Sequence, residues 1–136
     1  MASIFSRIIA GELPGRFVYR DEQCVAFLSI APLRPGHTLV VPIDEIDHWI
    51  DAPPALNAHL MQVAQKIAVA QQTAFSPTKV ALVIAGLEVP HLHLHVVPMQ
   101  TEADLHFGNA DTEPDADALD AAAAALRAAL GPDGSA

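Results

Sequence analysis

Three histidines alternate with apolar residues in the segment from His91 to Val97. Strict alternation is typical of a β-strand, in which residues two apart share one face. The three imidazoles therefore lie in one row, about 6 to 7 Å apart, and the leucines and valine between them face a core. Histidine accepts, donates or attacks near neutral pH, and a solvated strand face rarely uses it three times. The segment therefore predicts a sheet with a functional site on one face.

Two chemistries fit three imidazoles in a row. The first is a metal site, because histidine is a common zinc ligand, although the nearest acidic residues, Glu88 and Glu102, do not lie at a spacing that forces ligation. The second is phosphoryl or nucleotidyl transfer, in which one imidazole attacks phosphorus and the others hold oxygens or protonate the leaving group. The spacing of the histidines leaves both open.

The composition predicts one domain without a membrane span. A chain of 136 residues, 51% of them hydrophobic, can bury a core, yet no apolar run approaches the ~20 residues that cross a bilayer. The net charge of −9 argues against a nucleic-acid or anionic-membrane surface. No signal peptide is evident, and the single cysteine, Cys24, fits a cytoplasmic protein, in which we expect it to be a small buried hydrophobe.

Residues 1–100 read as an α+β domain. The pattern predicts a short helix over 3–10, a long helix that ends near residue 75, and helices on one side of a mostly antiparallel sheet. The apolar stripe of the long helix consists of Leu56, Leu60, Val63 and Ile67. The expected five strands cover residues 17–19, 24–28, 38–41, 79–84 and 91–97.

Residues 101–136 change in character. They are acidic from Asp111 to Asp120 and then rich in alanine, with Leu119, Leu126 and Leu130 at helical spacing. We expect a C-terminal extension whose added helix covers the domain or a dimer. A flexible acidic tail is the alternative.

Three segments resemble the histidine triad (HIT) family in the family's order. They are the N-terminal segment 3–14, the segment 25–42 with its Pro35-Gly36-His37 turn, and the histidine row up to Pro98. The likeness is greatest to the small histidine triad nucleotide-binding proteins. It implies a HIT-like fold, a homodimer, and a nucleotide or nucleotide conjugate, with a purine base, as ligand.

The resemblance also implies a role for each histidine of the site. His93 matches the nucleophile that attacks the α-phosphorus, and His95 matches the position that contacts the phosphate and assists the leaving group. His91 matches the outer histidine that orders the network. His37 matches a further histidine beside the triad.

The resemblance places substrate-binding residues as well. Phe5, Ile8, Phe27 and Ile30 match positions that sandwich a base, although their composition alone indicates core residues. Ser29 stands where the family usually has an acidic residue that grips the ribose, so we expect a weaker grip. Gly86 can offer a backbone N–H to an oxyanion.

Two further comparisons with the family set limits on the ligand. Glu88 stands where a hydroxyl or amide is expected near the phosphate, and its carboxylate repels phosphate but could orient a leaving amine. Ser3, Ser6 and Glu45 occupy the positions of zinc ligands in those members that hold a structural zinc. Hydroxyls are poor zinc ligands, so we expect no metal and no cofactor.

The sequence therefore predicts a hydrolase of nucleoside monophosphate conjugates, such as phosphoramidates or acyl adenylates, acting through a covalent intermediate on His93. A dinucleoside polyphosphate hydrolase and a nucleotide-binding protein with little turnover stay open as alternatives, and so does a metal-dependent hydrolase. Two other histidines, His59 and His106, carry no motif, and we expect both on the surface.

Overall fold

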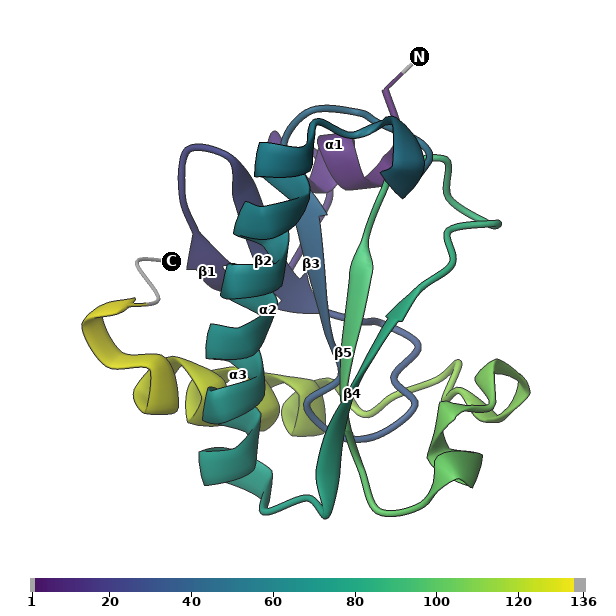
Figure 1. Cartoon of the computed structure of the whole chain (residues 1–136). Coiled ribbons are helices and arrows are strands. Elements are labelled where there is room, and N and C mark those ends of the chain that lie inside the picture. Colours follow the sequence, from purple (N-terminus) through teal and green to yellow (C-terminus); the bar gives the residue numbers. More distant parts are fainter. Residues whose placement is uncertain (1, 134–136) are drawn as a thin grey trace.

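A computed structural model describes residues 2–133 and contains one open, antiparallel sheet (Figure 1). The strand order is β1-β2-β3-β5-β4, and every neighbouring pair is antiparallel. The strands are β1 (Phe17–Arg20), β2 (Cys24–Leu28), β3 (Thr38–Pro42), β4 (Lys79–Ile84) and β5 (Leu94–Met99). The helices are α1 (Ile4–Ile9), α2 (Pro54–Phe75) and α3 (Ala116–Leu130), with short 3₁₀ turns between them. The α+β class and the five-stranded antiparallel sheet are confirmed.

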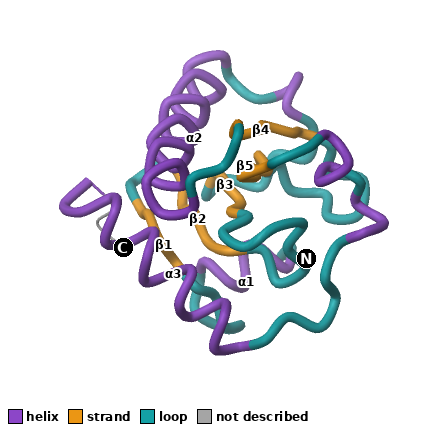
Figure 2. Tube along the Cα trace, turned by 90° about the horizontal axis from the view of Figure 1, so that it is seen from below, coloured by secondary structure: helices purple, strands orange, loops and turns teal. Residues whose placement is uncertain are grey.

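The helices cover both faces of the sheet, and the expectation that they share one side was wrong for α1. Helices α2 and α3 pack on one face, over a core that includes Val40, Leu94 and Val96 (Figure 2). Helix α1 inserts Phe5 into a separate cluster on the other face, with Phe27 among its members. Successive side chains of β2 and β3 point to opposite faces of the sheet, and every residue of both strands is buried. Each face of these strands therefore needs its own cover.

Helix α2 buries one stripe against the sheet. Its buried residues are Leu60, Val63, Ala64, Ile67, Ala70 and Gln71, while the expected Leu56 is only partly buried. Gln71 is fully buried, and its side-chain amide donates to the carbonyl oxygens of Gly36 (2.9 Å) and Val96 (2.8 Å). The amide thereby ties the turn before His37 to strand β5.

Strand β5 starts later than the alternation predicts. The ladder begins at Leu94, and His91 and His93 precede it, with the chain bent at His91. The reason is that the backbone before Leu94 bonds elsewhere, since Leu92 N–H donates to Ile46 O at 2.7 Å. The alternation of faces is nevertheless kept, because Leu92, Leu94 and Val96 all join the core under α2.

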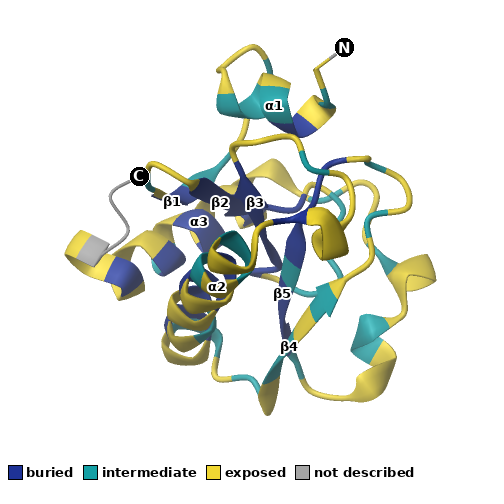
Figure 3. Cartoon of the chain, turned by 45° about the horizontal axis from the view of Figure 1, so that its top comes forward, coloured by how far each residue is buried: buried dark blue, intermediate teal, exposed yellow. Residues whose placement is uncertain are grey.

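The two edges of the sheet differ in cover. Helix α3 packs on β1, whereas β4 has a largely exposed or half-buried surface that includes Leu82 and Ile84 (Figure 3). A hollow of about 370 Å³ between α2 and β4 has Val69 and Val80 in its lining and contains none of the histidines. Within residues 2–133, no helix is long and apolar enough to cross a bilayer.

Candidate active site

The first histidine of the row is fixed at both ring nitrogens. His91 Nε2 lies 2.7 Å from the carbonyl oxygen of Pro42, which can only accept, so this nitrogen carries the proton. Its Nδ1 therefore accepts, and Ser3 Oγ donates to it at 2.6 Å. Ser3 is also the N-cap of α1, where its hydroxyl accepts from Ser6 N–H at 3.0 Å. His91 is fully buried and holds the start of α1 against the site.

The middle histidine presents one unprotonated nitrogen. His93 Nδ1 lies 2.8 Å from the carbonyl oxygen of His91, so Nδ1 is the donor and Nε2 keeps its lone pair. The ring of Phe5 packs edge-on against His93, with 4.9 Å between the ring centroids. His93 is thereby held as a neutral imidazole whose Nε2 can act as a nucleophile.

A second chain of hydrogen bonds orients His95. Leu33 N–H donates to His37 Nδ1 at 3.0 Å, which leaves the proton of His37 on Nε2. His37 Nε2 then donates to His95 Nδ1 at 2.9 Å. By the same logic neutral His95 carries its proton on Nε2, so it offers an N–H where His93 offers a lone pair. The ring centroids of His93 and His95 are 4.8 Å apart.

Burial keeps these imidazoles neutral. Desolvation, followed by repulsion from His95 and His93, lowers the pKa of His37 to about 3. Desolvation and the neighbouring His93 lower the pKa of His95 to about 4. The pKa of His93 is lowered as well, mainly by burial, although its bond to the carbonyl of His91 opposes the shift. Near pH 7 these three rings are therefore neutral donors and acceptors.

An apolar cluster adjoins His93. Phe5 and Phe27 meet edge to face at 5.6 Å, and Ile8 packs against this cluster from α1. Ile30 is 69% exposed and lies outside it, so the alternative in which Ile30 is a core residue was wrong. Ser29 is buried, and its hydroxyl accepts from Ala31 N–H at 3.1 Å. Their assignment to a base and ribose site stays a prediction.

The loop before the histidine row lies next to His93 at one point. Gly86 has a φ of +78°, and a Cβ added there would lie 3.9 Å from His93 Cε1. Glycine is favoured by this backbone conformation and lets the loop lie beside the ring. Glu88 is exposed, so water screens its carboxylate. Its effect on the choice of leaving group stays a prediction.

The sequence gave no reason to place Phe107 at the site. Its ring packs against His95, with centroids 4.9 Å apart and an interplanar angle of 67°, and the side chain is 44% exposed. Phe107 lies beyond the three matched segments and has no motif around it. Only its isolated position as an aromatic residue in a polar stretch distinguishes it.

The residues at the presumed zinc positions do come together, but their donors do not suit zinc. Ser3 N–H donates to the carboxylate of Glu45, and this bond is the main reason why the pKa of Glu45 is lowered. The hydroxyl of Ser3 is already engaged with His91. This cluster contains hydroxyls and a carboxylate but no thiolate, and its hydrogen bonds join α1 to the histidine row.

The expectation that His59 is a plain surface residue was wrong. Its side chain is 25% exposed, and its Nε2 lies 2.7 Å from Asp21 Oδ2. His106 is exposed, as expected. Cys24 is completely buried at the start of β2, which confirms its prediction as a buried residue.

Comparison with known proteins places the chain among histidine triad proteins. The HIT domain family model matches residues 10–102. Protein hit of Bacillus subtilis is 35% identical over 106 residues, which cover 74% of this chain and 73% of that protein.

Solved structures extend the similarity over nearly the whole chain. A Zn-bound histidine triad family protein from Mycobacterium smegmatis is 32% identical, with a TM-score of 0.81 over 96% of this chain and 94% of that one. A hypothetical histidine triad nucleotide-binding protein from Sulfolobus tokodaii is 26% identical, also with a TM-score of 0.81, over 93% of this chain and 90% of that one.

Proposed function

The chain belongs to the HIT domain family, and from this premise we propose that it hydrolyses nucleoside monophosphate conjugates, such as phosphoramidates or acyl adenylates. The observation that carries the proposal is the fixed protonation of two neighbouring rings. His93 Nε2 is unprotonated because Nδ1 donates to a carbonyl, and His95 Nε2 is protonated because Nδ1 accepts from His37. One ring supplies a lone pair and the next supplies a hydrogen-bond donor.

We assign the nucleophilic step to His93. Its Nε2 lone pair attacks the α-phosphorus, the bond from phosphorus to the leaving nitrogen or oxygen breaks, and the leaving group takes the bonding pair and one proton from solvent. Water then attacks the nucleotidyl-imidazole, the bond between phosphorus and Nε2 breaks, and the proton that water gives up balances the first one. Two moderate barriers thus replace one high barrier.

We assign His95 to hydrogen bonding of a phosphoryl oxygen or the leaving atom. Its pKa of about 4 keeps it neutral near pH 7, so it stabilises charge as a donor rather than by storing a proton. His37 and His91 act as positioning residues, because each fixes a neighbouring ring or strand through its own hydrogen bonds. This arrangement suits a protein with a charge of −9, in which local donors must hold the phosphate.

We expect the base to bind against the cluster around Phe5 and Phe27, because both lie on the same face as His93. The ribose contact from Ser29 is weaker than a carboxylate contact, since its hydroxyl oxygen is already engaged with Ala31. This supports a protein that depends little on the sugar. A weak ribose contact also fits the second candidate, a nucleotide-binding protein with slow turnover.

The test is the substitution His93→Ala, assayed with adenosine 5′-phosphoramidate and with adenosine monophosphate as a binding probe. We expect turnover to fall by far more than tenfold while the monophosphate still binds, because the apolar cluster stays. His106→Ala is the matched control at an exposed histidine. A His93→Ala protein that keeps a tenth of the wild-type kcat, a loss of only about 1.4 kcal/mol, would refute the covalent mechanism.

Trapping separates the enzyme from the slow binder. Wild-type protein quenched during turnover should carry one nucleotidyl group on His93, detected by mass spectrometry. Turnover without a trapped group, together with an active His93→Ala protein, would point to direct attack by water. Binding without turnover would leave only the nucleotide-binding protein.

A further inference from the structure

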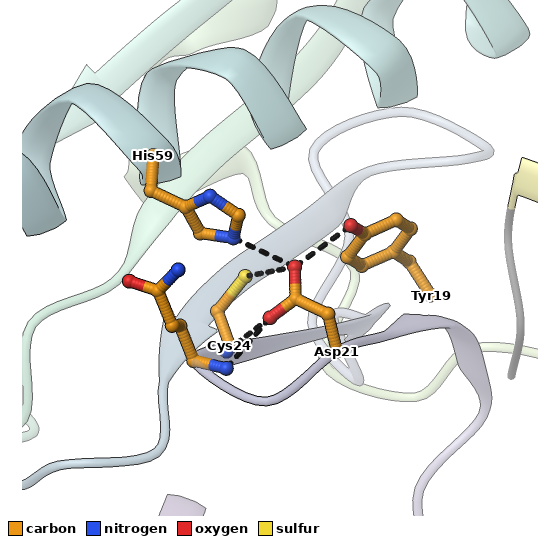
Figure 4. Close-up of polar contacts among 5 residues, drawn as sticks. Tyr19, Asp21, Cys24 and His59 are labelled. Carbon is orange, nitrogen blue, oxygen red and sulfur yellow. Dashed lines mark hydrogen bonds and ion pairs between the residues drawn. The ribbon is translucent and has the colours of Figure 1, made fainter.

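The hairpin β1–β2 and helix α2 bring three potential metal ligands to one point (Figure 4). His59 points from α2 toward Asp21, with 2.7 Å between Nε2 and Oδ2, and Cys24 Sγ lies 3.8 Å from the same oxygen. Among the described residues, this is the group of three whose ligand atoms all lie within 4.8 Å of one another. The histidine row does not converge in this way.

We propose that Asp21, Cys24 and His59 form a zinc-binding site, separate from the histidine row. A thiolate, an imidazole and a carboxylate are the ligand types that zinc takes in proteins. Three protein ligands leave a fourth position for water or a further donor. The side chains of Asp21 and His59 are 23% and 25% exposed, so this position faces solvent.

The distances require only small movements. A tetrahedral zinc with bonds of 2.0 to 2.3 Å sets its ligand atoms about 3.3 to 3.6 Å apart. The present separations from Asp21 Oδ2 are 2.7 Å to His59 Nε2 and 3.8 Å to Cys24 Sγ, and no pair exceeds 4.8 Å. Shifts on the order of 1 Å therefore suffice, and a partly exposed imidazole on a helix can supply most of them by rotation.

Hydrogen bonds from backbone groups and from Tyr19 already orient the carboxylate of Asp21. Asp21 Oδ1 accepts from the backbone N–H groups of Gln23 (2.7 Å) and Cys24 (2.8 Å), while Tyr19 Oη–H donates to Oδ2 at 2.7 Å. Such outer hydrogen bonds are the usual support of a metal ligand. They also explain why the turn places Asp21 and Cys24 together, since the side chain of Asp21 caps the turn itself.

Without a metal the thiol is inert. Burial, together with the adjacent carboxylate of Asp21, raises the pKa of Cys24 to about 12. Zinc binding must therefore release the thiol proton to solvent, and it replaces the hydrogen bond between His59 and Asp21 with two bonds to the ion. The charge of the ion offsets the repulsion between thiolate and carboxylate that opposes ionisation in the metal-free site.

This site departs from the expectation of a metal-free chain, which rested on Ser3, Ser6 and Glu45. It is also independent of the proposed hydrolase, because none of its ligands belongs to the histidine row. A bound ion would tie the β1–β2 hairpin to α2 more strongly than the present hydrogen bond between His59 and Asp21 does. We therefore expect zinc to act on the stability of the fold.

The test uses the untagged full-length protein, freed of metal and titrated with Co²⁺ and then Zn²⁺. We expect one equivalent of Co²⁺ to bind and to give a thiolate-to-cobalt absorption band that Zn²⁺ abolishes. Cys24→Ser should lose the band, and His59→Ala should weaken binding at least tenfold. His93→Ala is the matched control in the histidine row and should bind as the wild type does.

Thermal unfolding provides a second measurement in case Cys24→Ser does not fold. Zinc should raise the melting temperature of the wild type and of His93→Ala but not that of His59→Ala, whose changed side chain lies partly in solvent. Three results would overturn the proposal: no Co²⁺ bound, Co²⁺ bound without a thiolate band, or binding that His93→Ala abolishes and His59→Ala leaves unchanged.

Discussion

The burial of His37 should make the fold sensitive to mild acid. Its pKa falls from 6.5 to about 3 because the ring is desolvated and lies next to His95 and His93, which oppose a positive charge on it. Below pH 6.5 the unfolded chain protonates this histidine while the native protein does not. The unfolded state then binds more protons, so the free energy of unfolding falls as the pH drops, down to about pH 3.

The loss of stability at pH 5 follows from the difference between the pKa of His37 in the unfolded chain, 6.5, and the pH of 5. Each pH unit is worth about 1.4 kcal/mol, so neutral His37 costs about 2 kcal/mol of stability at pH 5 relative to pH 7.5. This is a large part of the roughly 5 to 15 kcal/mol that stabilise an ordinary domain. The proton stays off the ring because protonation of Nδ1 would remove the acceptor of Leu33 N–H and would place a positive charge on a desolvated ring.

The assay is urea unfolding at pH 7.5 and pH 5.0, with wild type, His37→Gln and His106→Gln. Glutamine has no titratable group, so His37→Gln should lose about 2 kcal/mol less than the wild type on going to pH 5.0. His106→Gln changes an exposed histidine and should follow the wild type. Any general cost of the substitution cancels, since only the difference between the two pH values is compared. Equal losses in wild type and His37→Gln would refute the reasoning.

Three further substitutions test the contacts around the site and the edge of the sheet. Ser3→Ala removes the N-cap of α1 and the donor to His91, so urea unfolding should show a loss of about 1 to 3 kcal/mol that Ser3→Thr largely restores. Phe107→Ala should lower kcat/KM about three- to tenfold for conjugates with an aromatic leaving group and little for a small amine, because the ring borders His95. We expect a homodimer that pairs through β4, the uncovered edge with exposed Leu82 and Ile84, so light scattering should find a dimer for the wild type and monomers for Leu82→Lys; a dimeric Leu82→Lys protein would place the contact elsewhere.

The sequence predicted most of the fold because its periodicities are clear. The apolar stripe of α2 and the alternation around the histidines gave the correct faces, and Leu92, Leu94 and Val96 lie in the core as expected. The position of α1 could not be read in this way. Its six residues show too little periodicity to indicate a face, and its place depends on Phe5 and on the bond from Ser3 to His91, which join residues 88 positions apart.

The same limit applies to the site. The motif indicated which histidines lie together. The nitrogen that carries the proton in each ring depends on backbone partners such as Pro42 and Leu33, and no sequence pattern shows that these groups lie next to the rings. Phe107 and the group around His59 were missed for a related reason. Neither Phe107 nor His59 belongs to a sequence motif, and only the folded chain shows what each contacts.

The part of the chain that forms the folded core extends further than the part that matches the family, because it includes helix α3. The family match ends at residue 102, but Leu126 is completely buried, and Leu119 and Leu130 lie in the same core as α2 and β1. Burial of a leucine contributes about 1.5 to 3 kcal/mol, so a chain cut at residue 102 would lose a stabilisation comparable to that of a whole domain. The last helix can therefore vary in sequence while it keeps its leucines, because its contribution to the fold is the apolar surface that it buries.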